Sequence, residues 1–182
     1  MAYFYFDHQD QPAQLPATVF SCILRQLLDQ QPAIPEAVSR VYNNIGSKGG
    51  LSQYECASLI AEVVKGLGHV YLVLDALDEC APEHRAPLLQ TLSQLSSVPG
   101  LRLLVTSRPH IREITTAFTR PLRLNIVARD EDIKLYIRQE LSRNGIHDMC
   151  DTDFATGLIQ RLSQGADGMQ VSPFLLLVET RD

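Results

Sequence analysis

Three carboxylates stand within five positions directly after an apolar run of the chain. The run covers residues 70–74 (VYLVL), and the acids are Asp75, Asp78 and Glu79. A carboxylate at the end of a strand can hold a hydrated magnesium ion, directly or through water. Two more in the following loop can orient an attacking water molecule. Taken alone, the pattern is also that of a strand that ends in a solvated acidic turn.

A cation follows a second apolar run. Residues 101–105 (LRLLV) are followed by TSRP, which contains Arg108. If the two runs form neighbouring strands joined by a right-handed helical crossover, Arg108 lies near Asp75 at the carboxyl edge of one sheet, where α/β proteins bind ligands. A cation there can face the terminal phosphate of a nucleotide. The sequence therefore predicts Asp75 and Arg108 on adjacent parallel strands. The alternative is a surface arginine in a turn before proline.

The elements that must position these residues alternate along the chain. Strand-like runs cover residues 2–6, 70–74, 101–105 and 122–126, and residues 174–178 near the end are also strand-like. Helical patterns cover residues 18–30, 52–66, 83–95, 130–143 and 152–164. Ser52 and Glu55 have the spacing of a capping box. Strands that alternate with helices predict an α/β fold with a parallel sheet covered on both faces.

The composition excludes several classes of protein. The chain has 182 residues, of which 45% are hydrophobic and 20% charged, so it can bury a core. A net charge of −5 argues against nucleic-acid binding by phosphate neutralisation. No apolar run is long enough to span a bilayer, and no secretory signal is visible. The four cysteines form no CxxC pair, which favours reduced thiols in a cytoplasmic protein.

Several segments resemble the NACHT-type P-loop NTPases. The stretch LVLDALDEC looks like the Walker B segment of this family, and LLVTSRP looks like its sensor 1 strand. AYFYFDHQD resembles the second strand of the domain, particularly in the nephrocystin-type N-terminal modules of fungal NLR-like proteins. ARDEDIKLYIRQEL resembles the segment that enters the helical region after the fifth strand, and LSQGADGM the helix end that follows. The resemblance covers nearly the whole chain up to Met169.

The resemblance implies a role for each of the four site residues. In the family, the residue that matches Asp75 supports Mg²⁺, those that match Asp78 and Glu79 supply the further acidic, catalytic function, and the one that matches Arg108 senses the γ-phosphate. The intact relative would be a signalling switch driven by ATP or GTP, with nucleotide state setting domain packing.

The resemblance also implies a domain organisation. Residues 1–128 would form a partial P-loop NTPase core with a parallel, three-layer sheet, and residues 129–169 would begin the helical region. Residues 170–182 (QVSPFLLLVETRD) depart from the family as a divergent tail.

The phosphate-binding loop of the family is missing from the sequence. No GxxxxGK[ST] is present, although its backbone N–H groups and lysine make most of the phosphate cradle. In the family it follows the first strand, whereas this chain begins at the second. Residues 46–50 (GSKGG) follow a helix and belong to an expected linker over residues 43–50. We therefore expect weak or no nucleotide binding by the chain alone, and no catalytic activity.

Loss of the first strand would leave residues 101–105 with an unpaired edge deep in the sheet. Residues 122–126 could pair with them directly, which we prefer because that strand already belongs to the sheet. The tail run 174–178 could enter instead, or the open edge could bind a partner strand or a second copy. Accordingly, the alternative function is a non-enzymatic interaction fragment with a relic acidic loop. A metal-dependent phosphotransfer enzyme is a weaker alternative, because no partner lysine is found.

Overall fold

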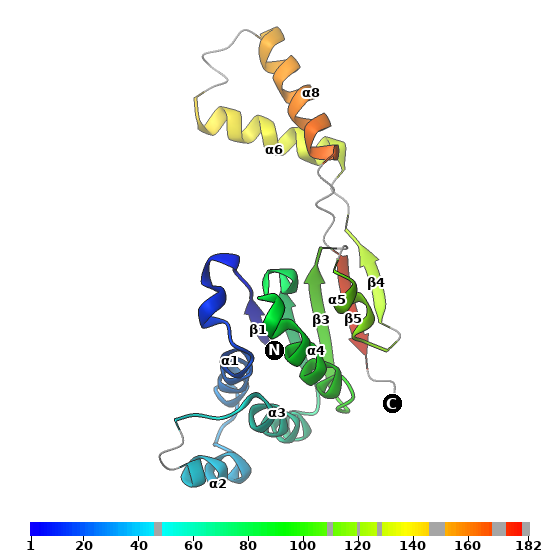
Figure 1. Cartoon of the computed structure of the whole chain (residues 1–182). Coiled ribbons are helices and arrows are strands. Elements are labelled where there is room, and N and C mark those ends of the chain that lie inside the picture. Colours follow the sequence, from blue (N-terminus) through cyan, green and yellow to red (C-terminus); the bar gives the residue numbers. More distant parts are fainter. Residues whose placement is uncertain are drawn as a thin grey trace. The chain divides into compact units, whose positions relative to one another are not determined.

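The chain folds into two compact units. The computed structural model describes residues 1–45, 49–108, 111–119, 121–126, 129–145, 152–168 and 174–179. One unit comprises Met1–Leu124 with Phe174–Asp182, and the other comprises Asn125–Pro173 (Figure 1). No helix in the described ranges is long and apolar enough to cross a membrane.

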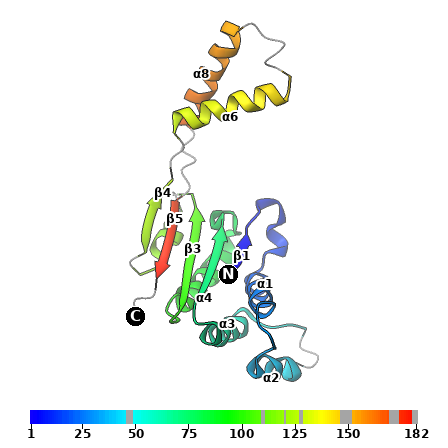
Figure 2. The ribbon, with the colours of Figure 1, turned by 180° about the vertical axis from the view of Figure 1, so that it is seen from behind.

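The first unit is built on a five-stranded sheet. Its strands are β1 (Ala2–Tyr5), β2 (Val70–Asp75), β3 (Leu101–Ser107), β4 (Leu122–Asn125) and β5 (Phe174–Glu179). They lie in the order β1-β2-β3-β5-β4 (Figure 2). β1, β2 and β3 are parallel, with Leu72 opposite Ala2 on one side and Leu103 on the other. The prediction that the strands before Asp75 and Arg108 are parallel neighbours is confirmed.

Helices cover one face of this sheet. The helices described in this unit are α1 (Pro16–Leu28), α2 (Glu36–Ile45), α3 (Gln53–Leu67), α4 (Pro82–Leu95) and α5 (Arg112–Thr116), with two short 3₁₀ helices, η1 (His8–Ala13) and η2 (Leu77–Glu79). α2 packs against α3 rather than against the sheet. Figures 1 and 2 show α1, α3 and α4 together on the same side. The core beneath them is mostly aliphatic and includes Phe20, Ile60, Leu72, Leu92 and Leu103, all fully buried.

The expectation of helices on both faces is wrong for the described part of this unit. Tyr3, Tyr5 and Tyr71 alternate with the buried strand residues and are 46%, 62% and 48% exposed. The strand order runs in one direction from β1 to β3, so successive right-handed crossovers place their helices on the same face. Tyr3 and Tyr5 thus lie outside the core, whereas Phe6 is buried.

α3 begins and ends as its sequence predicts. The Ser52 side chain accepts from the Glu55 N–H at 3.3 Å, and the Glu55 carboxylate accepts from the Ser52 N–H at 2.8 Å. This capping box satisfies backbone groups at the first turn. The helix stops at Gly68, whose φ of 76° lies in the left-handed region. The expected linker over residues 43–50 is wrong in its first part, because α2 extends to Ile45; residues 46–48 lie outside the described ranges.

The tail of the chain forms β5, which lies between β3 and β4. It pairs antiparallel with β3, from Ser107 opposite Phe174 to Arg102 opposite Glu179. Our preferred outcome, direct pairing of residues 122–126 with 101–105, is therefore wrong, and the sheet is not wholly parallel. An antiparallel neighbour satisfies the backbone groups of β3 as well as a parallel one does. The apolar tail run therefore closes the edge that we expected β4 to close.

The second unit is a pair of helices, α6 (Asp130–Arg143) and α8 (Thr152–Gly168). Leu141, Ala155 and Ile159 are buried within it. Other apolar side chains remain exposed, namely Leu135, Tyr136, Phe154 and Leu162. The two helices bury only part of their apolar surface against each other. The domain boundaries expected from the sequence remain a prediction.

The outer edge of β1 is bound by two glutamine side chains, Gln26 in α1 and Gln30 in the turn just after it. The Tyr3 N–H donates to Gln26 Oε1 at 3.0 Å, and Gln26 Nε2 donates to the Tyr3 carbonyl at 2.8 Å. Gln30 Oε1 accepts from the Met1 amino group at 2.8 Å, and Gln30 Nε2 donates to the Met1 carbonyl at 3.0 Å. Each carboxamide replaces the peptide group of a neighbouring strand. The free edge of the sheet is thereby closed to pairing with another chain.

Removal of both carboxamides should open this edge. We expect Gln26→Ala with Gln30→Ala to lower the free energy of unfolding by about 1–2 kcal/mol, since the four exposed hydrogen bonds to Met1 and Tyr3 are lost, and to promote self-association. Urea denaturation and light scattering measure the two effects. Gln90→Ala, at an exposed position of α4, is the control and should change neither. A double variant that stays monomeric with unchanged stability would contradict the role of the glutamines.

Candidate functional site

The residues predicted from the sequence gather at the carboxyl ends of β2 and β3. Arg108 Nε lies 3.3 Å from Asp78 Oδ2, and Arg108 Nη2 lies 3.6 Å from Glu79 Oε1. The Arg108 backbone N–H also donates to Asp78 Oδ1 at 3.2 Å. The Asp78 side chain is 8% exposed and that of Arg108 is 53% exposed. A carboxylate so deeply buried needs such a partner, because an unpaired charge would be costly there.

Asp75 is held by the neighbouring strand. The Thr106 hydroxyl donates to Asp75 Oδ1 at 2.5 Å, and the Ala76 N–H donates to Thr106 Oγ1 at 2.9 Å. We did not predict a role for Thr106 from the sequence. It is the residue opposite Asp75 if the pairing of β2 with β3 continues by one position. Leu74 lies opposite Val105 directly before this pair. The hydroxyl therefore fixes both the carboxylate and the start of the following loop.

The chain turns sharply after Asp75. Ala76 has φ 54° and ψ 43°, and it is the one non-glycine residue in the described ranges with a positive φ. This left-handed conformation costs a residue with a Cβ about 1–2 kcal/mol. The turn leads into η2, which carries Asp78 and Glu79 back over the edge of the sheet. The local strain is thus the cost of placing the acids beside Arg108.

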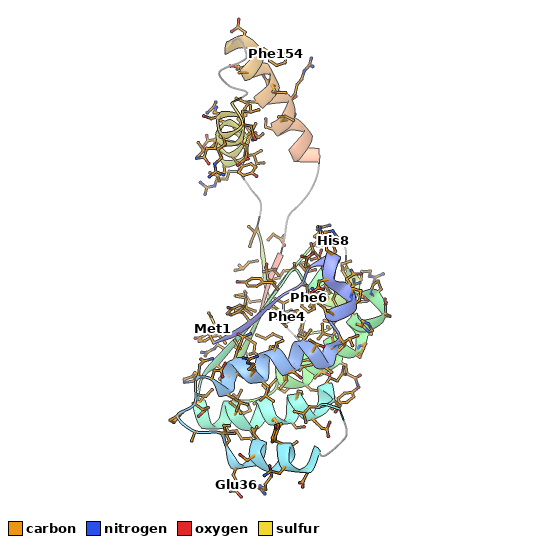
Figure 3. All side chains as sticks on the ribbon, turned by 90° about the vertical axis from the view of Figure 1, so that its left-hand side faces the viewer. Met1, Phe4, Phe6, His8, Glu36 and Phe154 are labelled. Carbon is orange, nitrogen blue, oxygen red and sulfur yellow. The ribbon has the colours of Figure 1, made fainter. Side chains whose placement is uncertain are left out.

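Asp7 and His8, which follow β1, also lie at the site, and the sequence did not indicate either of them. Phe4, Phe6 and His8 follow one another toward this edge (Figure 3). His8 Nδ1 lies 3.5 Å from Asp7 Oδ1 and 3.7 Å from Glu79 Oε2, and the His8 N–H donates to Glu79 Oε2 at 3.1 Å. The His8 side chain is exposed, and its contact with the acidic loop was not predicted from the sequence. Sequence spacing gave no signal, because Glu79 is brought there only by the pairing of β1 with β2.

The same end of β1 brings together three groups that can act as metal ligands. One ligand atom each from Asp7, His8 and Glu79 lies within 4.8 Å of the others. Asp7 and His8 are exposed, and Glu79 is half-buried. Gln11 Nε2 donates to the Glu79 carbonyl at 2.7 Å, which ties η1 to the acidic loop. The Asp7 backbone is bound by Gln14 in the way that Gln26 binds Tyr3, so the end of β1 is fixed on its outer side too.

A thiol is buried beside the acids. Cys80 is 1% exposed, and burial raises the pKa of its thiol to about 11; nearby Glu83 acts in the same direction and Arg85 opposes it. Burial also raises the pKa of the Cys56 thiol, in α3. Cys22, Cys56 and Cys80 are all free thiols, as expected for them; Cys150 lies outside the described ranges. A thiol that stays protonated is a poor nucleophile, so Cys80 is not a candidate for covalent catalysis.

The chemistry of these side chains suits a divalent cation better than a nucleotide. Asp75, Asp78, Glu79 and the Thr106 hydroxyl supply the oxygen ligands that Mg²⁺ prefers. A triphosphate needs many N–H donors and cations. Within the described part of this cluster, Arg108 is the cation that pairs with the acidic side chains, and both of its partners already neutralise it. Arg85 is buried and donates to the backbone of the loop. The ligand types therefore suit Mg²⁺, although among the described residues the ligand atoms that lie within 4.8 Å of one another come from Asp7, His8 and Glu79. The described residues offer too few cations to bind a phosphate chain.

Comparison with known proteins identifies a family for the chain. The family described as "Nephrocystin 3, N-terminal" matches residues 1–108, which contain β1, β2, β3 and all four predicted site residues. The vegetative incompatibility protein HET-E-1 of Podospora anserina is 27% identical over 141 residues, which cover 73% of this chain and 10% of that protein. The chain thus spans about a tenth of the length of this curated relative. No solved structure matches the chain. The chain belongs to the family of the nephrocystin 3 N-terminal region.

Proposed function

We propose that the chain is the metal-binding and phosphate-sensing part of a nucleotide-dependent signalling switch of the NACHT type. The observation that carries the proposal is the ion pairing of Arg108 with Asp78 and Glu79 across neighbouring parallel strands. An acidic loop and a cation meet at the edge where α/β sheets bind ligands. The similarity to a vegetative incompatibility protein supports a signalling role.

Each residue has a distinct part in this proposal. Asp75, oriented by Thr106, would hold Mg²⁺, and Asp78 and Glu79 would orient water at the same edge. When bound, Mg²⁺ would neutralise charge on phosphate oxygens. Arg108 pairs with the two acids here, and a terminal phosphate would compete with them for its guanidinium. If a phosphate replaced the two acids as the partner of Arg108, the acidic loop would lose its ion pairs and be free to move. Such a local change of ion pairing can drive a nucleotide-dependent switch.

The isolated chain should bind MgATP weakly or not at all. We expect no saturable heat in calorimetry, with a dissociation constant above about 1 mM, because Arg108 alone cannot cradle three phosphates. Mn²⁺, followed by electron paramagnetic resonance, should still bind, and Asp75→Ala should abolish that binding. Asp153→Asn, at an exposed site in α8, is the control. Micromolar ATP affinity that disappears in Asp75→Ala would show that the chain holds a phosphate site after all.

The second candidate is a non-enzymatic interaction fragment. It is favoured by β5, which takes the place beside β3 as an antiparallel strand, and by the lack of GxxxxGK[ST] in the sequence. In that case the ion pairs of Arg108 are purely structural. The Mn²⁺ experiment separates the two, because a relic loop would bind no metal and Asp75→Ala would change nothing.

A further inference from the structure

We propose that Arg85 is a positioning residue that fixes the acidic loop, residues 76–80, from its buried side. Its effect on metal binding rests on the function proposed above, whereas its effect on the loop does not. No resemblance or motif in the sequence singles this residue out. It lies in the first turn of α4, directly after the loop it would hold.

The guanidinium binds two carbonyl groups of the loop. Arg85 Nη2 donates to the Asp78 carbonyl at 3.0 Å and to the Cys80 carbonyl at 2.7 Å. Two N–H groups of the loop donate within it, that of Glu79 to the Ala76 carbonyl and that of Cys80 to the Leu77 carbonyl. The loop therefore makes its own turn, and Arg85 anchors that turn to α4.

Two arginines hold Asp78 from different sides. Its carbonyl accepts from Arg85, and its carboxylate pairs with Arg108. The backbone contact is the more buried one, because the Arg85 side chain is 9% exposed and that of Arg108 is 53% exposed. The direction in which the carboxylate meets Arg108 thus depends on where Arg85 places the backbone.

Arg85 is costly to bury, so its role is one of conformation more than of stability. Its Nε is buried without a hydrogen-bond partner in the part of the chain that the structure describes. Its Nη1 lies 3.6 Å from Glu113 Oε2, an acid whose side chain is 62% exposed. Water weakens such a pair. A buried charge whose partners are incomplete adds little net stability to the fold. Without Arg85, however, two carbonyl groups of the loop would lose their hydrogen-bond donor.

Thiol labelling tests the proposal, because Cys80 lies in the loop and Cys56 lies in α3. Both thiols are buried, so labelling of each reports the opening of its own surroundings. Arg85→Met and Arg85→Lys are made with Cys22 and Cys150 replaced by serine. We expect Arg85→Met to raise the labelling rate of Cys80 about tenfold and to leave Cys56 unchanged. Arg85→Lys should fall between, since an ammonium can donate to both carbonyls without the planar geometry.

A substitution far from the loop in sequence serves as the control. Arg138→Met, at an exposed site in α6, should change neither rate. Equal acceleration of Cys56 and Cys80 would show that Arg85 acts on global stability, and no acceleration would show that it does not hold the loop; either result overturns the proposal.

Mn²⁺ affinity tests the functional part. Arg85→Met should weaken it about three- to tenfold through misplacement of the acids. An unchanged affinity with an opened loop would overturn the functional part. If the unaltered chain binds no Mn²⁺, the proposed metal site fails, while the labelling result still decides the role of Arg85 in the loop.

Discussion

Deletion of residues 174–182 is expected to unfold or aggregate the first unit. β5 pairs with β3 over the whole length from Arg102 to Ser107. Without it, one edge of β3 loses its backbone partners while Leu101, Leu103 and Val105 remain in the core. Each buried unpaired group costs about 1–3 kcal/mol, and several of them match the ~5–15 kcal/mol stability of a whole domain. Circular dichroism and light scattering should therefore show a loss of cooperative unfolding and the formation of oligomers.

Two further variants distinguish the effect of losing β5 from the effect of shortening the tail. Deletion of residues 180–182 keeps β5 and should leave the unfolding transition unchanged. Leu175→Pro combined with Leu176→Pro keeps the tail but removes two adjacent backbone N–H groups. Neighbouring residues of a strand point their backbone groups to opposite sides, so one of the two prolines must face β3. If the 174–182 deletion remains monomeric and unfolds cooperatively at the same urea concentration, β4 can replace β5 at little cost, and the direct pairing that we preferred from the sequence is accessible.

The identity of most elements could be predicted because their signals are local. The capping box of Ser52 and Glu55 and the stop at Gly68 lie within α3 itself. The runs that became β2 and β3 are short, apolar and separated by one helix, so their parallel pairing follows from the handedness of the crossover. That pairing was enough to bring Arg108 to the acidic loop.

The predictions that proved wrong concern contacts between segments that are far apart in the sequence. The tail forms a strand, as its composition suggested. Its place beside β3 depends on which strand provides hydrogen-bond partners for the backbone of β3, and no local sequence pattern encodes that choice. Tyr3 and Tyr5 are exposed because all crossovers lie on one face, a property of strand order rather than of the residues. His8 meets the acidic loop only through the pairing of β1 with β2, whereas Arg85 is close to the loop in sequence but belongs to no motif that would indicate its role.

Gly100→Ala is expected to destabilise the first unit strongly. Gly100 lies directly before β3 with a φ of +83°, and a Cβ there would lie 2.0 Å from the Gly68 carbonyl oxygen. That oxygen belongs to the backbone at the end of α3, so it cannot rotate away. The Gly100 carbonyl also accepts from the Val70 N–H at 2.8 Å, which sets the register of β2 on β3. Left-handed strain of about 1–2 kcal/mol and overpacking of about 1–3 kcal/mol together predict a loss of roughly 2–5 kcal/mol in urea denaturation.

Gly66→Ala is the matched control, and it should have the opposite sign. Gly66 lies in the last turn of α3, where a Cβ would meet nothing within 4 Å. Alanine is favoured over glycine inside a helix by about 0.5–1 kcal/mol, so this variant should be slightly more stable than the unaltered chain. Both substitutions add the same methyl group, and any difference between them must come from backbone conformation and the neighbouring carbonyl. A Gly100→Ala variant as stable as Gly66→Ala would mean that the start of β3 can shift away from α3. The register that places Thr106 against Asp75 would then not be fixed by this turn.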